Sequence, residues 1–302
     1  MKKLLAFALT AALLLTLGAS AFAEGEAYGD LISDVAYIDD GDANHTLDIY
    51  GSDKAEATKT VVEVHGGGFI GGNKTTNTDH SIVFAEAGYV VVTPDYSKLP
   101  HVSFPDVIRE LFTVYNWVGE HAEEYHIDLD NVFLSGDSAG GYYVLLSMAI
   151  MRDPALQEYF GVTPPSYAFS GYVTTCPMAD IFSMRDDLGE DKKGPAAYTS
   201  NTIGAEILMD DDLMAHMDLF TCTDPAVFEG LYMMTTPGDK TTGATVVKFD
   251  AYLTDSGVAH TLKSYEDVEN ALLHVFNIGH TDWVESVAAN QDEIDFMDAL
   301  LN

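Results

Sequence analysis

Basic side chains are scarce in this 302-residue chain: Lys and Arg together number 14, against 48 Asp and Glu, and the formal net charge is −34. A surface this acidic repels nucleic acids, anionic lipids and polyanionic glycans, because like charges oppose the encounter. We therefore predict no nucleic-acid partner, and neutral small molecules or neutral glycans are favoured as ligands. The acidity marks no binding site by itself, since it also serves solubility or life in a salty habitat.

Cysteine is equally scarce. The two thiols belong to Cys176 and Cys222, and neither has a Cys or His neighbour at the spacing of a zinc site. Two cysteines allow one disulfide if the chain is exported. Cys176 closes an apolar, strand-like run, however, where a buried free thiol fits as well. The sequence leaves a disulfide and two free thiols open.

Long apolar runs are absent after the N-terminal stretch "MKKLLAFALTAALLLTLGASAFA", so no later membrane span is expected. This stretch has Lys2 and Lys3 at its start, an apolar centre over residues 4–17, and the small-x-small pattern of signal peptidase sites at residues 21–23. Because the centre is short and no basic stop-transfer residues follow, residues 1–23 are predicted to be a cleaved signal peptide rather than an anchor. The mature protein is expected to be secreted, extracellular or periplasmic.

No repeat, low-complexity tract or Pro/Ser-rich linker divides the chain, so residues 24–302 are predicted to form one domain. β-Branched runs alternate with segments whose apolar residues recur at helical spacing. Strands are expected at residues 34–38 and 46–51 (an antiparallel pair), 60–65, 89–96, 131–136, 170–178, 231–236 and 261–267, and helices at 104–125, 139–151, 245–257 and 282–301. The alternation predicts an α/β fold, a mostly parallel sheet with helices on both faces. Residues 180–225 interrupt it and are expected to form a small cap.

The stretch "NVFLSGDSAGG" places Ser138 between Gly136 and Gly140, where a predicted strand gives way to a predicted helix. G-x-S-x-G is a weak pattern alone, since glycine and serine are common. Between a strand and a helix it is typical of a nucleophile elbow, a strained turn that holds a serine hydroxyl clear of its neighbours. The helix dipole also favours negative charge near that serine. We therefore predict that Ser138 is a nucleophile.

A second glycine motif, "HGGGFIGG", begins at His65, at the end of an expected strand. Glycines leave backbone N–H groups uncovered, and acyl transfer needs such donors because its tetrahedral intermediate carries an oxyanion. The predicted donors are the amides of Gly67, Gly68 and Ala139. A phosphate-binding loop is the alternative, but the stretch matches neither G-x-x-x-x-G-K-[ST] nor G-x-G-x-x-G followed by an acid. His65 is expected to brace the loop rather than to act as a base.

Together, "HGGG" at 65–68 and "GDSAGG" at 136–141 resemble the signature of the hormone-sensitive-lipase-like carboxylesterases, a family of α/β-hydrolases. A third stretch, "DYSKLPHVSFP", is similar to that family's D-Y-R-L-A-P-E-x-x-F-P segment. The matching residues are Asp95, Tyr96, Pro100, Phe104 and Pro105, whereas Ser97 and His101 replace the family's Arg and Glu. The resemblance is strong over residues 58–150 and weaker beyond. It implies an α/β-hydrolase fold and ester hydrolysis without a metal or organic cofactor.

In this fold the acid and the base follow the serine, in the order Ser, Asp or Glu, His. "HVF" at 274–276 is similar to the family's H-x-F, so the resemblance implies His274 as the base. His280 is the alternative. "LYMMTTPGDK" resembles the strand-end segment that carries the family's acid, and Asp239 aligns with that aspartate, although a lysine replaces the proline that follows it there. Asp267 and Glu266 are the alternatives for the acid.

The implied mechanism is that of a Ser-His-Asp triad: Ser138 attacks an ester carbonyl, His274 takes its proton, and Asp239 orients the imidazole and stabilises its charge. The leading hypothesis is a secreted serine carboxylesterase for small neutral esters, such as acetyl or feruloyl esters of glycans. Two alternatives stay open, a serine peptidase of the same fold and a non-catalytic binding protein with this fold. Acyl and alcohol specificity and the oligomeric state are not determined by the sequence.

Overall fold

The computed structural model describes residues 30–183 and 210–302. The predicted signal peptide (1–23) and most of the predicted cap (180–225) lie outside these residues. The described chain forms an eight-stranded sheet in the order β1-β2-β4-β3-β5-β6-β7-β8. The strands are β1 (Ile32–Ala36), β2 (Thr46–Tyr50), β3 (Thr58–Val64), β4 (Val90–Pro94), β5 (Ile127–Asp137), β6 (Gly171–Thr175), β7 (Leu231–Thr235) and β8 (His260–Ser264).

The sheet is mostly parallel. β1 pairs antiparallel with β2, and β2 with β4, whereas every other neighbouring pair is parallel. Both the antiparallel opening and the parallel majority were predicted, and both are confirmed. The central strands β3, β4 and β5 consist of β-branched and apolar runs buried on both faces, as parallel strands between two helical layers must be.

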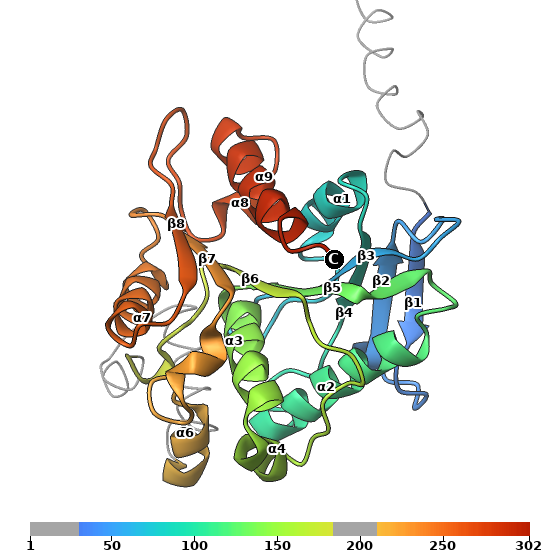
Figure 1. Cartoon of the computed structure of the whole chain (residues 1–302), viewed down its shortest axis with the longest axis horizontal. Coiled ribbons are helices and arrows are strands. Elements are labelled where there is room, and N and C mark those ends of the chain that lie inside the picture. Colours follow the sequence, from blue (N-terminus) through green and yellow to red (C-terminus); the bar gives the residue numbers. More distant parts are fainter. Residues whose placement is uncertain (1–29, 184–209) are drawn as a thin grey trace, which may run out of the picture.

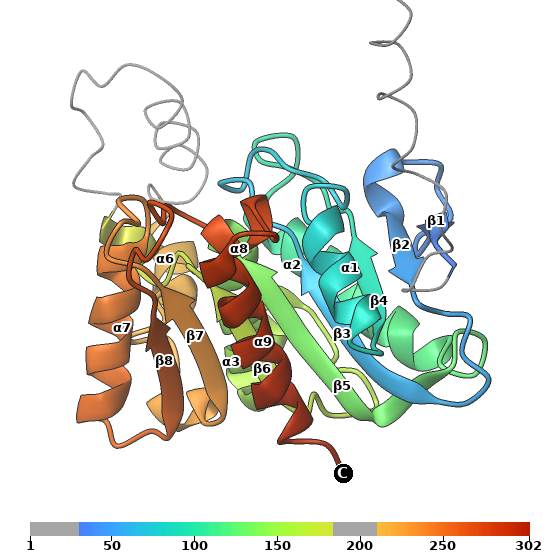
Figure 2. The same ribbon diagram turned by 90° about the horizontal axis from the view of Figure 1, so that it is seen from above.

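Helices cover both faces of this sheet. They are α1 (Thr78–Glu86), α2 (Phe104–Glu120), α3 (Ser138–Arg152), α4 (Pro154–Phe160), α6 (Asp211–Met217), α7 (Gly243–Asp255), α8 (Phe276–Gly279) and α9 (Val284–Asp298), with short 3₁₀ turns at Ala43–His45 and Pro225–Phe228. α1, α8 and α9 lie on one face and α2, α3 and α4 on the other, while α7 lies beside β8 at the end of the sheet (Figures 1 and 2). α3 is buried from Ser138 to Ile150 and forms the centre of its layer.

The sequence predicted α2, α3, α7 and α9 but not the other helices. Helix α1 was not predicted because its buried face carries the polar residues His80 and Ser81 beside Phe84 and Ala85. These polar residues interrupt the apolar periodicity. α4, α6 and α8 are too short for a periodic signal. α2 ends at Glu120 rather than at the expected residue 125, because the chain turns through His126, at a φ of +55°, to enter β5.

The parallel strands bring their carboxyl ends to one edge of the sheet, where α/β folds place their working groups. Residues 65–68 follow β3 and Ser138 follows β5. Cys176 follows β6, Asp239 follows β7, and His274 lies in the connection after β8. Residues far apart in the sequence therefore meet at this edge.

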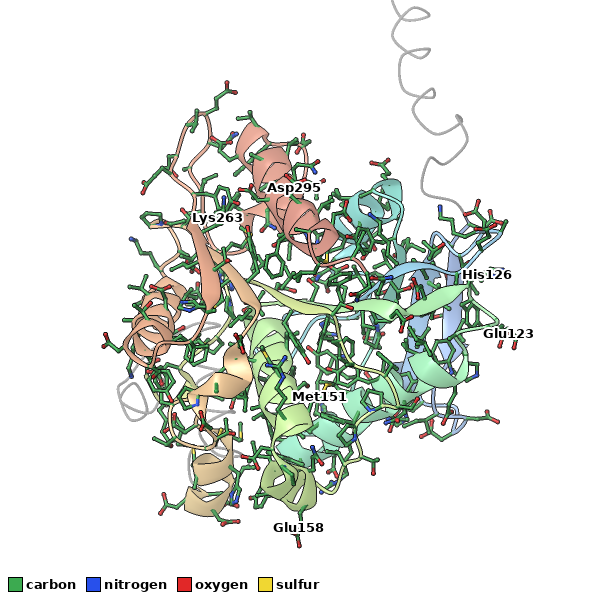
Figure 3. All side chains as sticks on the ribbon, viewed as in Figure 1. Glu123, His126, Met151, Glu158, Lys263 and Asp295 are labelled. Carbon is green, nitrogen blue, oxygen red and sulfur yellow. The ribbon has the colours of Figure 1, made fainter. Side chains whose placement is uncertain are left out.

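The molecular surface carries much of the acidic charge. Exposed carboxylates such as Glu123, Glu158 and Asp295 lie on the outside of the fold (Figure 3). Over residues 30–183 and 210–302, no helix combines the length and the apolar character that a bilayer crossing requires.

Candidate active site

Ser138 lies on a strained turn between β5 and α3. Its φ is +52°, in the left-handed region that serine seldom adopts, and its side chain is largely buried. The flanking glycines allow the turn. A Cβ on Gly136 would lie 2.8 Å from the backbone of Gly140, and one on Gly140 would lie 2.1 Å from the Val64 carbonyl oxygen. Strand β3, strand β5 and helix α3 thus approach more closely than any side chain permits.

Ser138, His274 and Asp239 form a continuous chain of hydrogen-bonding groups. The Ser138 Oγ lies 2.9 Å from His274 Nε2, and His274 Nδ1 lies 3.0 Å from Asp239 Oδ2. This contact fixes one arrangement for a neutral imidazole, in which Nδ1–H donates to the carboxylate and Nε2 accepts from the serine hydroxyl. The structure brings the three residues together in the order that the sequence predicted.

Asp239 is buried and held in its ionised form. Its Oδ1 accepts the backbone N–H groups of Thr241 at 2.8 Å and Thr242 at 3.0 Å, and its Oδ2 accepts the Thr242 hydroxyl at 2.7 Å. Burial alone would raise the pKa of Asp239, but the hydrogen bond from His274 and the bonds from Thr242 outweigh it and hold the pKa well below its usual range. The carboxylate is therefore a fixed negative charge beside the imidazole. Thr242 was not predicted from the sequence.

The loops that carry Asp239 and His274 touch through their backbones. A Cβ on Gly238 would lie only 1.8 Å from the carbonyl oxygen of Leu272, so only glycine fits there without moving one of the loops. Asp267, an alternative acid, accepts the Leu272 N–H at 2.8 Å and so supports the loop. Glu266, the other alternative, is exposed.

A carboxylate from α9 holds the loop that carries His274. Glu285 Oε1 accepts the backbone N–H groups of Val268, Glu269 and Asn270 at 3.0, 2.6 and 3.0 Å. Hydrogen bonds from the Asn270 side chain and from these amides lower the pKa of Glu285 to about 2. The sequence carried no signal for this contact, because a glutamate in the first turn of a helix is common.

The glycine loop after β3 presents uncovered amides. Gly67 and Gly68 have φ values of +129° and +62°, and a Cβ on Gly67 would lie 2.1 Å from the Gly71 carbonyl oxygen. Among the described residues, the N–H groups of Gly67 and Gly68 donate no hydrogen bond to the protein. Ala139 is the second residue of α3, next to Gly140, which packs on the carbonyl oxygens of Val64 and His65. The geometry leaves the amides expected to bind an oxyanion free to do so.

His65 braces this loop. Its ring stacks on Tyr96 with centroids 4.3 Å apart, and its Nδ1 lies 2.6 Å from the Gly66 carbonyl oxygen. The Tyr96 hydroxyl donates to the His65 carbonyl oxygen at 2.6 Å. Both motif residues therefore act on the loop conformation, and no hydrogen bond joins His65 to Ser138 in the described chain.

Asp137 ties the glycine loop to the serine turn. Its Oδ1 accepts the Gly66 N–H at 2.8 Å and the Asn77 side-chain amide at 2.9 Å. A Cβ on Gly66 would lie 2.3 Å from Asp137 Oδ2, so this glycine admits the carboxyl group. Burial raises the pKa of Asp137.

A fully buried ionic group lies next to the contacts of Asp137 with Gly66 and Asn77. His80 of α1 lies between two glutamates, with Nδ1 2.6 Å from Glu63 Oε1 and Nε2 3.2 Å from Glu293 Oε2. Burial alone would lower the pKa of His80, but the charges and hydrogen bonds of the two glutamates outweigh it and raise the pKa to about 10. Glu63 also accepts the Asn77 amide at 3.2 Å. The network thereby joins α9, α1 and β3 to the base of the serine turn.

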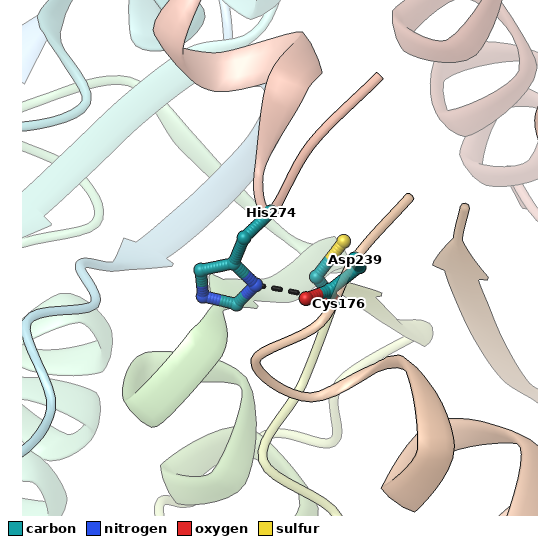
Figure 4. A group of neighbouring side chains, drawn as sticks. All are labelled: Cys176, Asp239 and His274. Atoms are coloured by element: carbon teal, nitrogen blue, oxygen red, sulfur yellow. Dashed lines mark hydrogen bonds and ion pairs between the residues drawn. The ribbon is translucent and has the colours of Figure 1, made fainter. Parts of the chain in front are cut away.

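His280, the alternative base, is exposed and stacks on Trp283, with centroids 3.9 Å apart. Both cysteines are free thiols, so the structure contains no disulfide between Cys176 and Cys222. Cys176 is buried, and burial together with the charge of Asp239 raises the pKa of its thiol. Its side chain lies against Asp239 and His274 (Figure 4), a contact that no spacing in the sequence indicated.

An opening antiparallel pair, six parallel strands and a serine turn after β5 give the chain the fold of an α/β-hydrolase, as predicted. Within that class the chain belongs to the BD-FAE family, which matches residues 47–227.

Known esterases are similar to the chain. An acetyl esterase from Salmonella paratyphi B is 36% identical over 95 residues, and this match covers 31% of the chain and only 29% of that protein's length. The crystal structure of esterase B from Lactobacillus rhamnosis is 25% identical, with a TM-score of 0.79, and covers 90% of this chain and 85% of that one. A further structure of esterase B, inhibited by a tributyrin phosphonate, has the same TM-score of 0.79 over 97% and 92%. A hyperthermophilic esterase from Pyrobaculum calidifontis, at 19% identity and a TM-score of 0.65 over 90% and 86%, shares the fold.

Proposed function

We propose that the protein is a serine carboxylesterase with Ser138 as nucleophile, His274 as base and Asp239 as acid. The observation that carries the proposal is the unbroken contact from Ser138 Oγ through His274 to Asp239, at 2.9 and 3.0 Å, on a strained strand–helix turn. An accidental cluster would not require the glycines at 136, 140 and 238 that admit each close approach. Membership of the BD-FAE family supports the same reading.

The proposed reaction has two halves. Ser138 Oγ forms a bond to the ester carbonyl carbon while its proton passes to His274 Nε2, and the amides of Gly67, Gly68 and Ala139 donate hydrogen bonds to the oxyanion. The bond to the leaving alcohol then breaks, and the imidazolium donates its proton to that oxygen. Water, deprotonated by His274, then attacks the acyl carbon. The bond to Ser138 Oγ breaks, the imidazolium returns the proton to that oxygen, and the acid is released. Asp239 stays ionised throughout, in agreement with its lowered pKa.

The proposed substrates are small neutral esters, including acetyl or feruloyl esters of glycans. The formal charge of −34 disfavours anionic substrates. The relatives support short acyl groups, since one is an acetyl esterase and another was inhibited by a tributyrin phosphonate.

We also propose that the protein is exported after cleavage behind Ala23. The basic start, the short apolar centre and the small residues at 21 and 23 support this. Expression of the full chain in a bacterium, followed by N-terminal sequencing of the extracytoplasmic protein, is expected to find Glu24 first. A full-length chain retained with the cells would contradict it.

One experiment separates the candidate functions. We expect a fluorophosphonate probe to label Ser138 in the folded protein, and nitrophenyl acetate and butyrate to be hydrolysed faster than dipeptide nitroanilides. Faster cleavage of the amides would favour a peptidase. No adduct on Ser138 would overturn both enzymatic readings and leave a binding protein. A panel of acetylated and feruloylated glycans then identifies the natural ester class.

A further inference from the structure

Three side chains that can bind a metal ion, those of Cys176, Asp239 and His274, lie close together. The Cys176 Sγ, the His274 ring nitrogen Nδ1 and an Asp239 carboxylate oxygen lie within 4.8 Å of one another. The side chains come from three separate segments, the ends of β6 and β7 and the loop after β8, and lie beside one another (Figure 4). Residues 30–183 and 210–302 contain no second group of three such donors at this spacing.

The donor set is characteristic of zinc-like ions. Thiolate, imidazole and carboxylate are the ligands of Zn²⁺ and of the softer divalent ions, whereas Mg²⁺ and Ca²⁺ take oxygen ligands. Zinc–ligand bonds of about 2.0–2.3 Å in a tetrahedron place neighbouring donors roughly 3.3–3.6 Å apart. His274 Nδ1 and Asp239 Oδ2 are already 3.0 Å apart, so these two must separate slightly while the thiol moves inward.

We propose that Cys176, Asp239 and His274 form a site for a zinc-like divalent cation that inhibits the enzyme. The ion binds His274 Nδ1, and the proton of the neutral imidazole moves to Nε2. Nε2 then carries a hydrogen and no longer accepts the Ser138 proton. The Cys176 thiol loses its proton to solvent, so one proton is released for each ion bound, and the site charge rises from −1 to 0. Solvent water supplies the remaining ligand.

The inhibitory consequence rests on the proposed function, whereas binding of the ion does not. The His274 side chain is 23% exposed and that of Asp239 is fully buried, and Cys176 is also buried. The imidazole is therefore the exposed member of the cluster, and an ion from solvent enters past it. With such a site, free zinc lowers the rate of turnover, and removal of the zinc restores it.

The first test measures inhibition. Zinc chloride is expected to inhibit hydrolysis of nitrophenyl acetate, with full recovery on adding EDTA and no effect of magnesium chloride. Cys176→Ser removes one ligand and is expected to raise the zinc concentration for half-inhibition by at least about tenfold. Cys222→Ser is the matched control and should behave as the unaltered protein. Equal zinc sensitivity in Cys176→Ser and the unaltered protein would overturn the proposal, and Cys176→Ala serves if the serine variant fails to fold.

The second test does not need turnover. Ser138→Ala should bind cadmium with a cadmium–thiolate absorption band, and calorimetry with zinc in two buffers of different protonation enthalpy should find one ion bound and one proton released. Both signals should be lost in Ser138→Ala/Cys176→Ala. Absence of the band in Ser138→Ala would overturn the metal site. If the band forms but the unaltered protein hydrolyses no ester, the metal site stands and the proposed function fails. If the ion binds without inhibiting an active enzyme, coordination of Nδ1 is wrong.

Discussion

The two halves of the candidate active site are held by different forces. The serine half, on β3, β5 and α3, is a contact of backbones: Gly66 and Gly140 leave no room for a Cβ, and buried Asp137 joins the two turns. Behind it lies the buried ion group of His80 and its two glutamates. Strain at Ser138 is thus resisted by the core of the protein.

The acid–base half consists of Asp239 and His274, which lie in the loops after β7 and β8. A close backbone contact joins Gly238 to Leu272, and the loop with His274 is held from α9 by the Glu285 carboxylate. The contrast teaches that damage to the serine half should appear mainly as lost stability. Damage to the acid–base half should appear mainly as lost turnover in a folded protein.

The largest effect on turnover is expected at Ser138 and His274, where the two halves are in contact. Ser138→Ala and His274→Ala should each lower kcat by about 10⁴-fold or more, since a triad acts as a unit, while circular dichroism and thermal melting stay near those of the unaltered protein. His280→Ala is the matched control. If His280→Ala loses activity and His274→Ala keeps it, the base is misassigned.

The next largest effect on turnover is expected from a change in the acid–base half alone. Gly238→Ala forces a Cβ against the Leu272 carbonyl oxygen and separates Asp239 from His274. Because a displacement of about 1 Å in a catalytic group can cost roughly 10²-fold in rate, we expect kcat to fall by that order with little change in KM. Steady-state kinetics and urea unfolding on the same sample measure both quantities. A large loss of stability with intact kcat per folded molecule would erase the contrast between the halves.

The serine half should respond in the opposite manner. Gly140→Ala drives a Cβ into the carbonyl oxygens of Val64 and His65, and overpacking of a well-filled site lowers the free energy of unfolding by about 1–3 kcal/mol. Gly279→Ala is the control, because a Cβ there meets nothing within 4 Å. Equal unfolding midpoints in urea for the two variants would show that the turn at Ser138 accommodates the added Cβ without loss of stability.

Glu285→Gln tests the clamp on the loop with His274. The amide side chain still accepts hydrogen bonds but without charge, so we expect kcat to fall by about tenfold, the lower range for groups that orient a functional residue. The pKa of Glu285 is depressed to about 2 from 4.5. Its contribution to stability is therefore complete above pH 4.5 and lost as the pH falls toward 2.

Urea unfolding of Glu285→Gln and the unaltered protein across this acid range isolates that contribution from that of Asp239. Glu266→Gln, an exposed neighbour on the same loop, is the control and should match the unaltered protein. If the variant has the same acid dependence as the unaltered protein, Glu285 does not clamp the loop.

The smallest effect on turnover is expected from the ion group behind the serine half, which acts on stability. The pKa of His80 is raised from 6.5 to about 10, so its contribution to stability is complete below pH 6.5 and is lost as the pH rises toward 10. Stability measured by urea unfolding should therefore decline between pH 7 and 10, and His80→Gln should flatten the decline. His280→Gln, an exposed histidine, should leave it unchanged. A stability that is constant across this range in the unaltered protein would contradict the raised pKa.

Much of the serine half could be predicted because its signals are local. The glycines of "HGGG" and "GDSAGG" adjoin the residues they serve, and the strands and α3 are marked by continuous apolar runs. The acid–base half was harder, since Asp239 and His274 had to be chosen among several Asp and His residues by resemblance to a family. Gly238, Thr242 and Glu285 were missed, because their partners lie on other loops and nothing in their own neighbourhood distinguishes them.

By itself, the sequence determined the alternation of strands and helices, the tight turn at Ser138 and the bare amides of the glycine loop, because each follows from residues adjacent in the chain. Only the tertiary structure decided which histidine faces the serine, which glutamates enclose His80, and that Cys176 lies against Asp239 and His274. The physical reason is the parallel sheet, which collects the ends of strands that are distant in sequence at one edge. Side-chain packing at that edge then sets the distances.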